Sequence, residues 1–153
     1  MSDQPWTPPT GQDWTEPDLQ GYKPDMSEAE CTRQVKIRYP FCVFSGVPYG
    51  DDAHVFPRST HPKLSTDVFN RVRIERRHHS TLAACFDKYA DGTYRDIGEK
   101  IYMLQNWTLP DIRQKVKRQI ELLRLSCEYH RIHWPEIKEP KDADALRYQE
   151  RLQ

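Results

Sequence analysis

The sequence lacks long apolar runs, paired cysteines and an excess of either charge. No stretch reaches the roughly 18 apolar residues that a bilayer span requires, so we expect no membrane segment. The N-terminus is acidic and has no apolar core of the kind that a secretory signal needs. The four cysteines, at positions 31, 42, 85 and 127, are scattered, which favours reduced thiols over a disulfide framework. We therefore expect an intracellular, cytoplasmic protein.

Apolar residues make up only 37% of the 153-residue chain. This length suits one domain, but so polar a composition builds a core only if part of the chain stays outside it. Five of the 12 prolines fall in the first 24 residues. We predict three parts: an acidic, disordered arm over residues 1–32, a folded domain over residues 33–134 and a charged tail over residues 135–153.

The net charge of zero is the sum of unlike segments. Residues 1–32 carry seven acidic side chains and one basic, whereas residues 33–85 carry nine basic and four acidic. A basic middle segment is what a polyanionic partner requires. For the arm, three interpretations stay open: a solvated tail, a segment that folds over the basic region, and a binding site for a protein partner.

Local patterns predict a mixed α+β fold. Residues 34–45 alternate apolar and polar side chains up to Pro40, which predicts one or two strands. Short strand-like runs follow at 53–57 and 68–74, and apolar residues at spacings of three and four predict a helix beginning near Ser80. Longer periodic segments predict helices over residues 93–107 and 109–132. The order of the central elements is strand, loop, strand, helix.

The central segment contains three marks at set spacings: AHVFPRS at 53–59, Asn70, and RRHHS at 76–80, in which His79 lies nine residues after Asn70. This pattern resembles the HNH endonuclease family, the ββα-metal nucleases, over roughly residues 38–88. The resemblance implies a hairpin followed by a helix, acting on nucleic acid with a divalent metal ion.

The resemblance also implies roles for single residues. His54 would be the general base, Asn70 would orient it or brace the hairpin loop, and Arg58 would bind phosphate. His79 would bind Mg²⁺ or Mn²⁺, with Zn²⁺ or Ni²⁺ also compatible with an imidazole ligand. The residue before the base is commonly a second ligand, but here it is Ala53. Asp51 shares its strand parity and could replace it, whereas Asp52 is expected to face the other way.

Two further expectations come from the same region. Many family members have zinc knuckles where this chain has CVFSG at 42–46 and ERRH at 75–78, from which all sulfur except Cys42 is lost. The basic residues of the second strand and its end are predicted to bind nucleic acid: Arg71, Arg73, Arg76 and Arg77. We therefore predict a metal-dependent HNH endonuclease acting on DNA, with RNA open as a substrate and a size compatible with a phage or mobile-element enzyme. The alternative is a catalytically inactive nucleic-acid-binding or interaction module.

Overall fold

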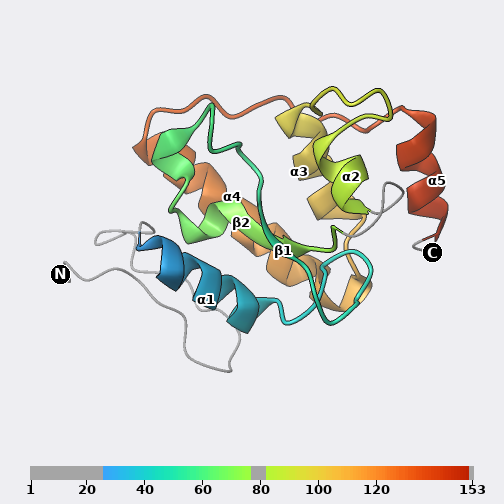
Figure 1. Cartoon of the computed structure of the whole chain (residues 1–153). Coiled ribbons are helices and arrows are strands. Elements are labelled where there is room, and N and C mark those ends of the chain that lie inside the picture. Colours follow the sequence, from blue (N-terminus) through green and yellow to red (C-terminus); the bar gives the residue numbers. More distant parts are fainter. Residues whose placement is uncertain (1–25, 77–81, 152–153) are drawn as a thin grey trace.

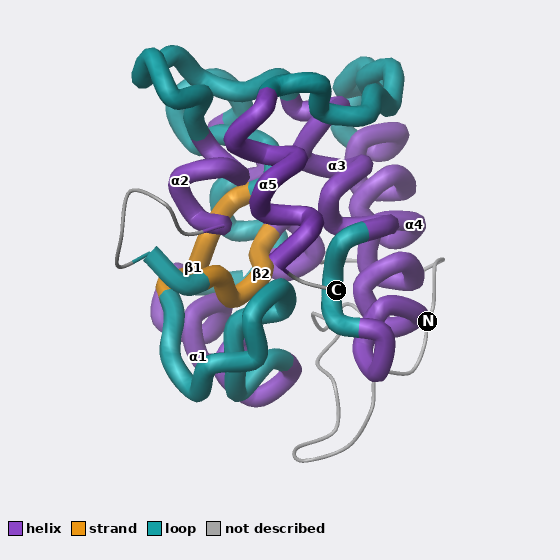
Figure 2. The backbone as a smooth tube through the Cα atoms, turned by 90° about the vertical axis from the view of Figure 1, so that its right-hand side faces the viewer, coloured by secondary structure: helices purple, strands orange, loops and turns teal. Residues whose placement is uncertain are grey.

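The computed structural model describes residues 26–76 and 82–151, in which a two-stranded antiparallel hairpin lies among five α-helices (Figure 1). The mixed α+β class is confirmed. Helix α1 lies on one side of the hairpin and α2 and α3 on the other, while the long α4 runs behind it (Figures 1 and 2). The elements are α1 (Glu28–Arg38), β1 (Asp51–His54), β2 (Arg71–Ile74), α2 (Leu82–Asp87), α3 (Ile97–Asn106), α4 (Arg113–Tyr129) and α5 (Ala143–Arg151).

Helix α1 corrects the strand predicted from residue 34 onward. The Ser27 hydroxyl caps its first turn by accepting a hydrogen bond from the Glu30 amide at 3.2 Å. Acidic residues at its start and basic residues at its end complement the helix dipole. Cys31 and Val35, four residues apart, are buried, so the apolar pattern fits a helical face as well as a strand. The helix also crosses the predicted boundary at residue 32, so residues 28–32 are not part of a disordered arm.

The hairpin pairs His54 with Arg71 and Asp51 with Ile74. The two predicted strands are present, although each is only four residues long. Their connection, residues 55–70, is no simple surface loop, because it contributes five side chains to the core: Val55, Phe56, Leu64, Val68 and Phe69. This connection is therefore fixed by apolar packing as well as by hydrogen bonds.

The predicted helices over residues 93–107 and 109–132 correspond to α3 and α4, and both are confirmed. Asp96 and Glu99 form a capping box at the start of α3. In α4, Gln119 is buried and donates hydrogen bonds to the Phe69 and Arg71 carbonyls at 2.9 and 2.7 Å. Its carbonyl accepts from the Tyr39 hydroxyl at 2.6 Å, so one amide joins α4 to the hairpin and to the end of α1.

The segment after residue 135 is more than the charged tail that was predicted. Ala145 of α5 is fully buried, and Ile137 and Tyr148 pack against the core. Gly98 allows this segment to approach α3, since a Cβ there would lie 1.9 Å from the Glu136 carbonyl oxygen. None of the helices within residues 26–76 and 82–151 has the length and apolarity to cross a membrane.

Candidate active site

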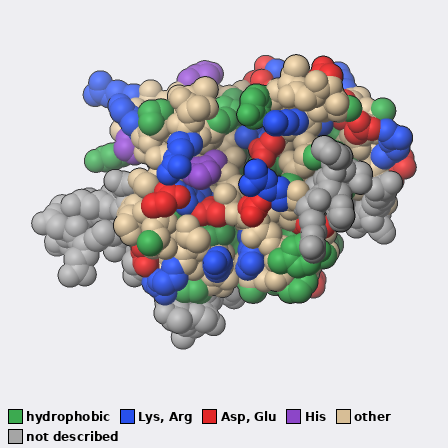
Figure 3. All heavy atoms as spheres, viewed as in Figure 1, with side chains coloured by type: hydrophobic (Ala, Val, Ile, Leu, Met, Phe, Trp, Pro, Cys, Tyr) green, Lys and Arg blue, Asp and Glu red, His purple; other side chains and the backbone are tan. Residues whose placement is uncertain are grey.

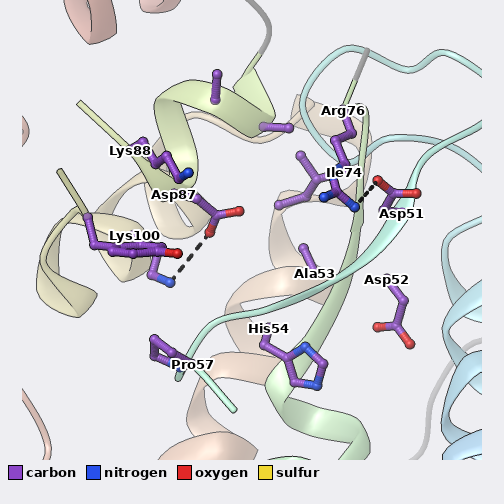
Figure 4. Close-up of a pocket in the computed structure, with 13 residues that line it drawn as sticks. Asp51, Asp52, Ala53, His54, Pro57, Ile74, Arg76, Asp87, Lys88 and Lys100 are labelled. Atoms are coloured by element: carbon purple, nitrogen blue, oxygen red, sulfur yellow. Dashed lines mark hydrogen bonds and ion pairs between the residues drawn. The ribbon is translucent and has the colours of Figure 1, made fainter. Parts of the chain in front are cut away.

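A groove of about 600 Å³ lies between the hairpin and the two helices α2 and α3 (Figure 4). All four residues of β1 line it, from Asp51 to His54. The opposite wall is formed by α2, α3 and the residue after α2, and its charged residues are Asp87, Lys88 and Lys100. The groove therefore brings the predicted base and both predicted aspartates to one place.

His54 is half-buried at the end of β1, with its Nε2 atom 3.2 Å from the Ser65 carbonyl oxygen. Because a carbonyl only accepts, Nε2 carries the hydrogen and Nδ1 keeps a free lone pair. Burial and the nearby charge of Arg71 lower the pKa of His54 from its ordinary value of 6.5, against opposing effects of the Ser65 bond and the carboxylates of Asp52 and Glu28. The imidazole is thus neutral at pH 7, as a general base must be.

Asn70 is fully buried and braces the connection between the strands. Its Oδ1 accepts a hydrogen bond from the Phe56 amide at 2.7 Å, and its Nδ2 donates to the carbonyls of Phe56 and Leu64 at 3.0 and 3.1 Å. Two roles were predicted for Asn70, orienting the base or bracing the loop. The contacts described here are those of a residue that braces the loop. Ser65, which anchors His54, directly follows Leu64 in this braced loop.

Arg71 does not lie where an exposed nucleic-acid contact was predicted. Its side chain is fully buried, and its guanidinium donates to the Ser65 carbonyl, to Asp52 Oδ2 at 2.7 Å and to Glu28 Oε2 at 2.6 Å. The prediction that Arg71 contacts nucleic acid is therefore wrong, because its side chain is buried within the protein. Arg71 instead links α1, the hairpin and the carbonyl that anchors His54.

The two aspartates of β1 point in different directions, as strand parity predicts, and by the same parity His54 shares the face of Asp52 rather than that of Asp51. Asp52 is engaged by Arg71 and by the Thr32 hydroxyl at 3.3 Å, both on the α1 side. Asp51 is half-exposed and pairs with Arg76 at 3.3 Å. Asp51 is thus the carboxylate of β1 that is accessible to a ligand in the groove, whereas Asp52 is bound within the buried network around Arg71.

The other predicted cations have varied environments. Arg58 is exposed and pairs with Glu28 at 3.1 Å, and Arg73 is half-buried with its Nε donating to the Gly50 carbonyl at 3.3 Å. Arg76 is exposed. Arg77, His78 and the predicted metal ligand His79 lie outside the described residues. On the face shown in Figure 3, acidic and basic side chains are intermixed rather than forming one basic field.

A divalent cation fits the groove only in part. Imidazole and carboxylate are suitable donors, and Asp51 supplies one of them. Within the part of the chain that the structure describes, however, no group of three or more histidine, cysteine, aspartate or glutamate side chains is arranged to hold a metal ion. A complete ligand set would have to include residues from outside that part.

The two segments that resemble zinc knuckles lie side by side. The Val43 amide donates to the Arg73 carbonyl at 3.0 Å, and the Ser45 hydroxyl donates to Glu75 Oε2 at 2.8 Å. The turn itself is closed by Gly46, whose amide donates to the Cys42 carbonyl at 2.9 Å and whose φ is +80°. A hydrogen bond between two of the substituted positions therefore connects the segments that thiolates would join through zinc.

Several charged residues in and near the groove were not predicted, among them Glu28, Asp87 and Lys100. Glu28 contacts both Arg58 and Arg71 from the start of α1, and Asp87 pairs with the buried Lys100 in the groove wall. The sequence contains one signal that could have identified Lys100. This residue lies three residues after Ile97 and four before Leu104, within the apolar stripe of α3. A charged residue on such a stripe is unusual in a core helix.

Comparison of the chain with family models, with curated proteins and with solved structures found no match in any of the three. The arrangement of the groove therefore carries the functional argument.

Proposed function

We propose that the chain is a metal-dependent endonuclease of the HNH type that hydrolyses phosphodiester bonds of DNA. The observation that carries the proposal is the state of His54: a neutral imidazole, anchored through Nε2, in a groove that also contains Asp51. A base of this kind is what activation of water near pH 7 requires. The loop that anchors it is braced by Asn70, the residue for which the sequence pattern predicted that role.

His54 would take a proton from the attacking water through its free Nδ1 lone pair. The Ser65 carbonyl favours the imidazolium that forms, because its hydrogen bond from Nε2 is stronger when the ring is charged. Arg58, exposed near Glu28, would bind a phosphate oxygen. A divalent ion, held by His79 and Asp51 in this proposal, would supply positive charge to the phosphate.

Cleavage of a circular plasmid tests the proposal. With Mg²⁺ or Mn²⁺ the purified full-length chain should convert supercoiled DNA to nicked or linear product, and the chelator EDTA should stop the reaction. Parallel reactions with a labelled RNA decide between the two nucleic acids. Binding of either without cleavage at any metal concentration would favour the alternative, an inactive nucleic-acid-binding module.

A further inference from the structure

Lys100 is a buried ammonium in the wall of the groove. Only 4% of its side chain is exposed, and its Nζ lies 3.6 Å from Asp87 Oδ1 and 5.3 Å from the centre of the Phe86 ring. The aliphatic neighbours on α3, Ile101 and Leu104, belong to the core. A leucine or methionine would fill this position without placing a charge there, so the ammonium needs an explanation beyond packing.

Asp87 compensates for this burial incompletely. Its carboxylate is about half-exposed, and the 3.6 Å separation is longer than a good charge-assisted hydrogen bond. Burial lowers the pKa of Lys100 and raises the pKa of Asp87 in spite of their attraction. The ammonium of Lys100 is therefore disfavoured by its surroundings, and a second anion beside Nζ would favour this charged form.

The groove offers a binding position for such an anion next to Lys100. Lys100 and Asp87 point from α3 and α2 toward the strand that carries Ala53 and His54 (Figure 4). All four residues line the same groove, and phosphate is the anion that a nuclease groove receives. Lys100 belongs to α3, outside the strand, loop, strand and helix unit that the sequence pattern marked.

We propose that Lys100 is a further substrate-binding residue, whose ammonium contacts a phosphate oxygen of the nucleic acid in the groove, and that Asp87 is a positioning residue that holds it. This inference rests on the proposed function. It makes α3 part of the substrate-binding wall opposite β1, with a phosphate of the nucleic acid bound between the two walls.

The test compares Lys100→Met with Lys138→Met. Lys138 is a matched control because its Nζ also lies 3.6 Å from an aspartate, Asp96, but it is half-exposed and does not line the groove. Binding of a short DNA duplex is measured in EDTA over a series of salt concentrations, cleavage is measured with Mn²⁺, and unfolding is followed in urea.

Lys100→Met leaves Asp87 without its partner, but because that carboxylate is about half-exposed the loss of stability should be small. Its DNA affinity should fall about tenfold and the slope of log affinity against log salt should decrease by about 1, the signature of one lost phosphate contact. Its KM for cleavage should rise, and Lys100→Arg should restore most of the affinity. Lys138→Met should match the wild type in every measurement.

Wild-type affinity and slope in Lys100→Met would overturn the inference while leaving the proposed function intact. If the wild type binds DNA but does not cleave it, the nuclease proposal fails and the salt slope still decides the role of Lys100. A wild type that neither binds nor cleaves overturns both. If Lys100→Met does not fold, Lys100→Gln replaces it in the same comparison.

Discussion

Asn70 and His54 are connected through the backbone of one loop, to which both side chains are hydrogen-bonded. Three hydrogen bonds from Asn70 hold Phe56 and Leu64, and the next residue, Ser65, holds the imidazole of His54 at 3.2 Å. The position of the base therefore depends on a side chain that makes no contact with the groove. Each of the two residues permits a separate prediction.

Replacing Asn70 by alanine should lower the free energy of unfolding by about 3 kcal/mol, because the Phe56 amide and two carbonyls lose their partner inside the core. Urea denaturation measures the change. Asn106→Ala is the control, since the exposed Asn106 amide donates only to the Tyr102 carbonyl of its own helix, and its effect should stay within about 0.5 kcal/mol. Equal effects of the two substitutions would show that Asn70 does not brace the loop.

The pH dependence of cleavage should reflect the lowered pKa of His54. The neutral imidazole is the active form, so the rate should fall as pH decreases through this pKa. Because burial and Arg71 lower the pKa from 6.5, the half-maximal rate should occur below pH 6.5 and the rate should be level around pH 7. Single-turnover rates at a saturating metal concentration measure this profile, and a midpoint above pH 6.5 would contradict the assignment.

Helix α1 packs against the hairpin through the ion pairs of its first residue. Its first residue, Glu28, pairs with Arg58 and with the buried Arg71. The hydrogen bond with Arg71 is the main cause of the lowered pKa of Glu28, so this carboxylate is ionised at pH 7. Glu28 therefore pairs with the exposed guanidinium of Arg58, which in the proposed function binds phosphate.

Glu28→Gln should strengthen DNA binding in EDTA several-fold, because Arg58 loses a competing carboxylate. Glu30→Gln is the matched control: it removes the same charge from the same helix, but Glu30 pairs with Arg33 and not with Arg58. Salt titrations of both variants separate local competition from a general charge effect. Identical affinities in the two variants would exclude the competition.

The elements differ in how far the sequence could predict them. Helices α3 and α4 were predictable because Ile101 and Leu104, and likewise Val116, Ile120 and Leu123, recur at helical spacing. The sequence did not predict helix α1, because its apolar residues also alternate over residues 34–39. In addition, the capping residue Ser27 lies within the segment that was predicted to be a disordered arm. Local patterns decide an element only when a single periodicity fits them.

The site shows the same limit. His54, Asn70 and Asp51 could be proposed because residue type and spacing alone single them out, and their roles stay predictions. The burial of Arg71 could not be predicted, since its partner Glu28 is 43 residues away in the sequence. Lys100 and Gln119 likewise gain their importance from partners that only the tertiary structure brings near.

In the described part of the molecule, two acidic residues of the N-terminal sequence, Glu28 and Glu30, pair directly with arginines of the basic middle segment. Arg33, Arg58 and Arg71 all pair with Glu28 or Glu30. The surface on the face shown in Figure 3 is mixed in charge, so attraction of a polyanion depends on a few local cations rather than on a broad basic field.

The measurement that tests the proposed nuclease most directly is the single-turnover rate of DNA cleavage by His54→Ala, compared with wild type and with His133→Ala at saturating Mn²⁺. His133 is an exposed histidine that does not line the groove, so its variant should cleave at the wild-type rate. Loss of a general base predicts a rate about 10²–10⁴-fold lower for His54→Ala, with DNA affinity and stability little changed. A His54→Ala rate within about threefold of wild type would fall well short of that loss and would contradict the assignment of His54 as the base.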